Sequence, residues 1–78
     1  MEIIIFASPV SAFDIVVGND SGLAVSSTTA FSCDVISTIE DIMDIHDIKH
    51  IRIKGPRLYI EQIAKELETV FDIPVIQS

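Results

Sequence analysis

The sequence predicts a two-layer α/β domain in which a mixed five-stranded sheet carries two helices on one face. Three observations indicate this class. Apolar segments bounded by turn residues fill the first third of the chain, two amphipathic helical patterns follow, and a short apolar segment comes after each helical pattern. The 78 residues are enough for one domain, so residues 1–78 are taken as a single unit.

The first three strands are expected at residues 2–7, 12–18 and 23–27. The first is a continuous apolar run, typical of a strand in the interior of a sheet, and Ser8-Pro9 ends it because proline has no N–H to donate. Residues 19–22 (NDSG) form a turn that tolerates positive φ angles, so the second and third strands should pair as an antiparallel hairpin. The hydroxyl-rich residues 26–29 are interpreted as a polar loop that leads towards a helix cap.

Two helices and two strands make up the rest of the chain. Ser32 is expected to cap a first helix whose apolar spacing continues to Ile45 or His46. Residues 48–53 should form a fourth strand, and the dipeptide Gly55-Pro56 should open a second helix that continues to residue 71. Residues 73–76 are expected to be a short strand at a sheet edge, because they contain a proline.

The order strand, strand, strand, helix, strand, helix, strand leads to a specific topology. Crossovers between parallel strands are right-handed, so two successive crossovers in one direction place both helices on the same face. The predicted spatial order of the strands is therefore 3-2-1-4-5, with the opposite face of the sheet left open.

The open face is the predicted site of function. On the fourth strand two isoleucines should face the helices, which leaves the basic side chains between them on the other side. The first strand is apolar on both sides, so either Ile3 and Ile5 or Ile4 and Phe6 also face outwards. An exposed apolar face usually marks an interaction surface. The predicted interface residues are Ile4, Phe6, Val16, His50, Arg52 and Lys54, and the predicted partner is a second copy or another protein. The alternative is that loops of the chain itself cover this face.

The charge distribution limits other partners. The formal net charge is −7, which argues against broad electrostatic binding of nucleic acid. However, four of the five Lys and Arg residues lie at positions 49–57. A local anion or nucleic-acid site in this stretch is therefore an alternative, with Lys54, Gly55 and Arg57 at the start of the second helix as its candidate residues.

The chain resembles the ribonuclease H-like superfamily, which includes Holliday-junction resolvases and the halves of actin-like ATPases. The resemblance is carried by residues 51–56 (IRIKGP), similar to the resolvase strand that ends in a catalytic glutamate before Gly-Pro, and by the hairpin of residues 15–25. It implies a nuclease that holds metal between an acidic residue on the first strand and that glutamate. Here Lys54 stands at the glutamate position, and the first strand has only Glu2 at its start. The resemblance therefore implies a catalytically inactive relative.

No other constellation predicts chemistry. Asp44, His46, Asp47 and His50 have a spacing that metal sites use, but the four straddle a helix end and are equally consistent with a solvated connection. Cys33 is the single cysteine and is interpreted as a small residue at a helix start. We therefore expect no catalytic residues, no metal site and no cofactor.

These observations favour a non-catalytic interaction module that self-associates through its open sheet face. No apolar run is long enough to cross a membrane and no secretory signal is recognised, so a cytoplasmic setting without a membrane partner is expected. The small size and the lack of catalytic residues resemble accessory proteins encoded by phages. The alternatives are an anion or nucleic-acid binder and a nuclease relative.

Overall fold

The computed structural model describes residues 1–7 and 12–77. Its elements are β1 (Glu2–Phe6), β2 (Ala12–Gly18), β3 (Ala24–Phe31), a 3₁₀ turn (Ser32–Asp34), α1 (Val35–Ile45), β4 (His50–Lys54), α2 (Arg57–Val70) and β5 (Val75–Gln77). The sheet order is β3-β2-β1-β4-β5, which confirms the predicted topology. β2 pairs antiparallel with β1 and β3, whereas β4 pairs parallel with β1 and β5.

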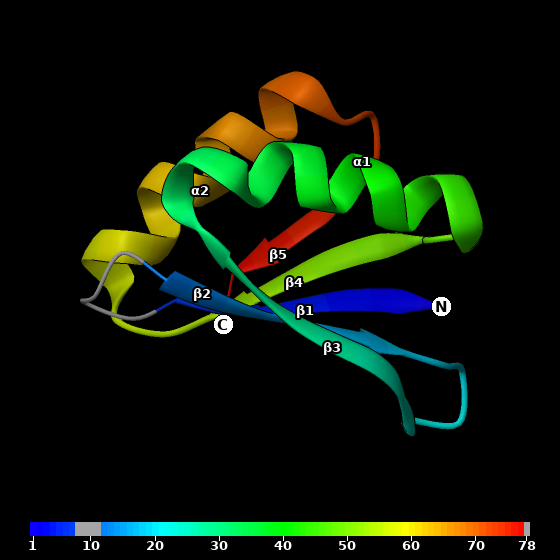
Figure 1. The fold of residues 1–78 in the computed structure, drawn as a ribbon. Helices are drawn as coiled ribbons and strands as arrows, with labels where there is room; N and C mark the ends of the chain where they lie inside the picture. The colour runs from blue at the N-terminus through cyan, green and yellow to red at the C-terminus, as the bar shows by residue number, and fades with distance from the viewer. Residues whose placement is uncertain (8–11, 78) are drawn as a thin grey trace.

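Both helices cover the same face of the sheet, as predicted (Figure 1). Between the two layers lies a core of aliphatic side chains in which isoleucine predominates. Among the residues that the structure describes, those with no exposed surface are Ile3, Ile5, Ile15, Ile39, Ile51, Ile53, Ala64 and Leu67. Each central strand contributes every second residue to this core, because successive side chains of a strand point to opposite faces.

The position of β1 in the sheet explains its apolar character. It is the middle strand, paired with β2 on one side and β4 on the other, and its two faces are apolar for different reasons. Ile3 and Ile5 face the helices and are fully buried, whereas Ile4 is half-buried and Phe6 is exposed on the opposite face. The structure thus decides the alternative that the continuous apolar run left open.

The predicted end of the third strand was wrong. Residues 26–29 are not a polar loop, because β3 continues to Phe31 and pairs along the whole of β2. The Thr29 hydroxyl donates a hydrogen bond to Asp14 Oδ1 at 3.1 Å, so the cross-strand partner satisfies a hydroxyl group that looked like a loop signal. Threonine is β-branched and fits the surface of a strand as well as it fits a turn.

The predicted helix cap was also wrong. Ser32 is the first residue of the 3₁₀ turn, and α1 begins at Val35 after Asp34. The other element boundaries agree with the prediction to within two residues, and the end of the first strand at Ser8-Pro9 lies outside the described residues. Within the described ranges, neither helix combines the length and the apolar character needed to span a membrane.

Candidate functional site

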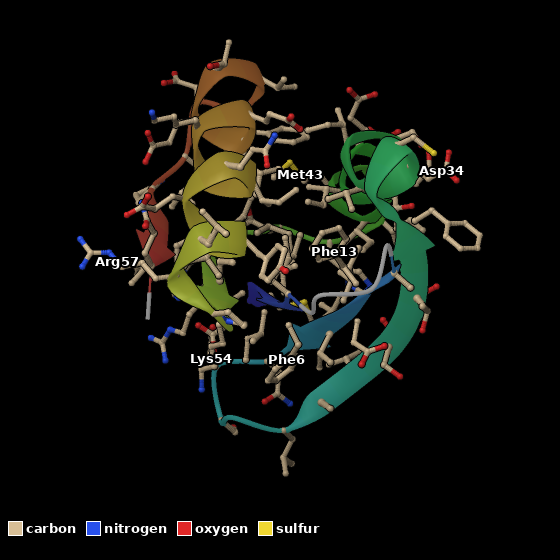
Figure 2. All side chains as sticks on the ribbon, turned by 90° about the vertical axis from the view of Figure 1, so that its left-hand side faces the viewer. Phe6, Phe13, Asp34, Met43, Lys54 and Arg57 are labelled. Atoms are coloured by element: carbon tan, nitrogen blue, oxygen red, sulfur yellow. The ribbon has the colours of Figure 1, made fainter. Side chains whose placement is uncertain are left out.

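The open face of the sheet has an apolar centre on its two middle strands. Ile4 lies opposite Val16 in the antiparallel pairing of β1 and β2, and Phe6 lies opposite Asp14. Phe6 is 41% exposed, although it belongs to the central strand of the sheet. Figure 2 shows Phe6 on the side of the sheet away from the helices, whereas Phe13 points into the space between the two layers.

The β4 side of this centre carries the predicted basic side chains. The parallel register places Ile4 beside Arg52 and Phe6 beside Lys54. Figure 2 shows Lys54 on the same side of the sheet as Phe6. The three predicted basic residues of β4 therefore share the open face with the apolar centre, as the alternation along the strand indicated.

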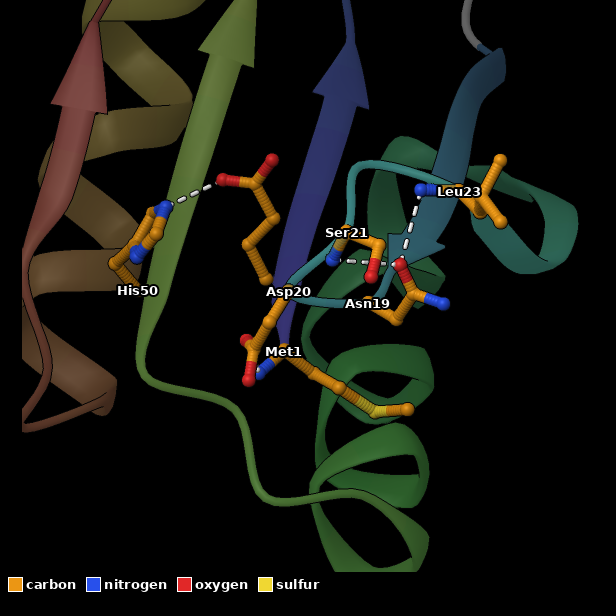
Figure 3. Close-up of polar contacts among 7 residues, drawn as sticks. Met1, Asn19, Asp20, Ser21, Leu23 and His50 are labelled. Atoms are coloured by element: carbon orange, nitrogen blue, oxygen red, sulfur yellow. Dashed lines mark hydrogen bonds and ion pairs between the residues drawn. The ribbon is translucent and has the colours of Figure 1, made fainter.

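Glu2 changes the electrostatics of this basic row. Its carboxylate Oε2 contacts His50 Nε2 (Figure 3) and lies 3.9 Å from Arg52 Nη2. Both contacts are only partly exposed, so water screens them less than contacts at the surface. The β4 row is thus not a free cationic patch. Glu2 offsets the charge of Arg52 and leaves Lys54 as the ammonium group beside Phe6.

The β2 and β3 side of the face is polar and acidic. A shallow depression of about 360 Å³ lies there, lined by Phe6, Asp14, Val16, Ser27, Thr28 and Thr29. On the open face as a whole Arg52 and Lys54 balance Glu2 and Asp14, so its formal charge is close to zero. The net charge of −7 therefore resides on the rest of the surface, mainly on the helices with Glu40, Asp41, Asp44, Glu61, Glu66 and Glu68.

The candidate anion-site residues lie at the end of β4 and the start of α2. Arg57 lies in the first turn of α2, where its Nε forms an ion pair with Glu61 Oε1 at 3.0 Å. Gly55 has a φ of 142°, and a Cβ atom on it would lie 2.5 Å from the carbonyl oxygen of Ala7. The glycine is therefore required by the close approach of two backbone segments, where Ala7 N–H donates to the carbonyl of Lys54 at 2.8 Å.

The candidate metal ligands are not assembled either. Within residues 1–7 and 12–77, no group of three or more His, Cys, Asp or Glu side chains is arranged to hold a metal ion. His46 follows the last residue of α1, whereas His50 lies on β4 against Glu2. Cys33 is exposed in the 3₁₀ turn.

The hairpin turn is attached to the start of β1. The side-chain oxygen of Asn19 accepts hydrogen bonds from the N–H groups of Ser21 and Leu23, each at 3.0 Å (Figure 3). Asp20 Oδ1 lies 3.0 Å from the amino group of Met1. The hydrogen bond and the charge of this ammonium group lower the pKa of Asp20, and Lys49 lowers it further.

Glu2 and Asp14 are not among the interface residues predicted from the sequence. The period of two along each strand contains the signal, because Glu2 shares a face with Ile4, and Asp14 shares one with Val16. Only the register between strands shows that Glu2 meets His50 and that Asp14 lies beside Phe6.

No known protein family matches the chain, and no curated protein or solved structure is detectably similar to it. The ribonuclease H-like relationship therefore stays a prediction.

Proposed function

We propose that this chain is a non-catalytic interaction module that self-associates face to face through the open side of its sheet. The observation that carries the proposal is the apolar centre formed by Ile4, Phe6 and Val16 on the face that the helices leave uncovered. Apolar surface gains about 25 cal/mol for each Å² removed from water, so a second layer over this centre is favourable.

A second copy suits this face because of its charge. The chain is strongly acidic overall, so two copies repel each other over most of their surfaces. On the open face the charges balance, with the basic row on β4 and Asp14 on β2 at opposite sides of the apolar centre. A surface that carries both signs on its two sides is self-complementary, as an isologous dimer interface requires.

The size of the face sets the expected affinity. With about 4.8 Å between strands and about 3.4 Å per residue, five strands of five residues cover roughly 400 Å². Stable complexes bury about 800 Å² per partner. We therefore expect a reversible dimer with a dissociation constant on the order of micromolar or weaker.

Sedimentation equilibrium over a series of protein concentrations tests this proposal with two matched variants. Phe6→Asp places a charge in the apolar centre, and Leu58→Asp places the same charge on an exposed leucine of α2. The wild type and Leu58→Asp should associate as the concentration rises, whereas Phe6→Asp should lose this association. A wild type that stays monomeric at about 1 mM contradicts the proposal, as does association by Phe6→Asp equal to that of the wild type.

Salt separates this function from the anion-binding alternative. Added salt screens the long-range repulsion between two acidic copies, so self-association should strengthen or stay constant as salt rises. Binding of a fluorescent single-stranded oligonucleotide, in contrast, would weaken steeply with salt. The anion-binding alternative requires that the wild type binds this oligonucleotide and that Arg52→Glu does not.

A further inference from the structure

The strand register contains enough information to orient the second copy. Phe6 has Asp14 beside it on β2 and Lys54 beside it on β4, so the two opposite charges lie at the same level along the strands. β1 is the middle strand of the five, with two strands on each side. The open face therefore has its apolar residues along the middle, a cation on one side and an anion on the other.

We infer that two copies pack about a two-fold axis that runs parallel to β1 and midway between the two sheets. This inference rests on the proposed self-association. Such an axis exchanges left and right across β1 but preserves the level along the strand. It therefore places β4 of each copy over β2 of the other, and Lys54 of each copy opposite Asp14 of the other.

The same axis also places the outer strands of the two sheets over each other. Because β1 is central, each β5 then lies over β3 of the other copy and no strand is left without a counterpart. Ile76 on β5 is 40% exposed and shares the level of Ile4 through Arg52. In the dimer it would pack against the other copy's Ser27, which lies at that level on β3. Aligned sheets pack about 10 Å apart and differ in direction by about 30°, so contacts near the axis shift less than contacts of the edge strands.

The perpendicular orientation is unfavourable for electrostatic reasons. A two-fold axis that runs across the strands would place β4 over β4 and β2 over β2. With that axis at the level of Phe6, Lys54 would face Lys54 and Asp14 would face Asp14, and at any other level Lys54 would lie opposite a different β4 residue and never opposite Asp14. Like charges placed directly opposite each other across an interface are destabilising, so charge selects the axis parallel to β1.

Charge reversal at the two positions tests this orientation. Lys54→Asp and Asp14→Lys should each raise the dissociation constant of the dimer about tenfold, because each contact occurs twice. The double variant should recover most of the wild-type affinity, since the opposite charges again face each other. Arg57→Asp is the matched control, because it changes the net charge as Lys54→Asp does but lies on α2. It should leave the dimer within about twofold of the wild type.

Each other outcome has a separate meaning. If Lys54→Asp strengthens association, the basic rows face each other and the inferred axis is wrong. If both single variants weaken the dimer and the double variant does not recover it, the Lys54–Asp14 contact across the interface is absent. If the wild type does not associate at all, the proposed self-association is wrong, and the orientation of the two copies no longer applies. A thermal unfolding curve for each variant, measured by circular dichroism, shows that all of them are folded.

Discussion

The two faces of the sheet use the same kinds of residue for different purposes. Along β1, Ile3 and Ile5 point to the helices and are completely buried, while their neighbours Ile4 and Phe6 point to the uncovered side. The residue type is nearly constant, so only the side of the sheet distinguishes the two pairs. This difference separates stability, which depends on the covered face, from recognition, which we assign to the open face.

Substitution of two adjacent isoleucines of β1 tests most directly whether the covered face contributes more to stability than the open face. Ile5→Ala should lower the free energy of unfolding by about 2–5 kcal/mol, because it leaves a cavity in the core. Ile4→Ala should cost about 1 kcal/mol, since its side chain is only half-buried. Urea unfolding of the two variants measures the difference. Equal losses would show that the open face supports the fold as strongly as the core does.

Two glycines at turns provide the next largest effect. Gly55 and Gly22 both have positive φ angles, but only Gly55 has a neighbouring atom, the Ala7 carbonyl oxygen, where a Cβ would lie. Gly22→Ala should cost about 1 kcal/mol from backbone strain alone. Gly55→Ala should cost roughly 1–3 kcal/mol from strain and more from the clash, because this turn connects the sheet to α2. Thermal unfolding of both variants would show whether the clash matters. Similar losses would mean that the Ala7 backbone moves away at little cost.

Removal of the charge of Glu2 should have a smaller effect. Glu2→Gln keeps the shape of the side chain but removes the carboxylate charge that contacts His50 and pairs with Arg52. We expect a loss of about 0.5–1 kcal/mol in the free energy of unfolding. Glu61→Gln, which weakens the more exposed pair with Arg57 on α2, is the control and should change stability less. A larger loss for the control would mean that burial does not strengthen the pairs on the open face.

The smallest predicted effect is a dependence on acidic pH. The pKa of Asp20 is lowered in the folded chain by the Met1 ammonium group, so this carboxylate stabilises the fold above its unfolded pKa of 3.8. The contribution disappears as the pH falls through the lower, folded pKa. Wild type should therefore be slightly more stable than Asp20→Asn near neutral pH, and urea unfolding curves at successive pH values should converge in acid. A constant difference at all pH values would contradict this assignment.

Much of the fold could be predicted because its signals are local or follow general rules. The apolar run of β1, the turn at residues 19–22 and the helical spacing in α2 identified their elements. The handedness of crossovers then ordered the strands without any knowledge of contacts. Prediction failed where one residue type suits two structures. The Ser and Thr residues of β3 have the composition of a loop, and only pairing with β2 stabilises them as a strand.

The candidate site was only partly predictable for a related reason. His50, Arg52 and Lys54 were placed on the open face from their alternation with buried isoleucines. Their neighbours across the strands could not be placed, because Glu2 is separated from His50 by 48 positions in the chain. The close approach of Gly55 to Ala7 could not be predicted either, because the two residues are equally far apart in the sequence.

By itself, then, the sequence determined which segments form strands and helices, their order in the sheet, and the existence of an uncovered face. Those properties follow from the periodicity of apolar residues and from the order of the elements, and both are properties of the linear sequence. The tertiary structure alone decided that Ile4 and Phe6 are the β1 side chains that face outwards and that Glu2 contacts His50 of the basic row. It also placed Asp14 and Lys54 on either side of Phe6. Register between strands is set by packing of the whole core, so no local pattern reveals it.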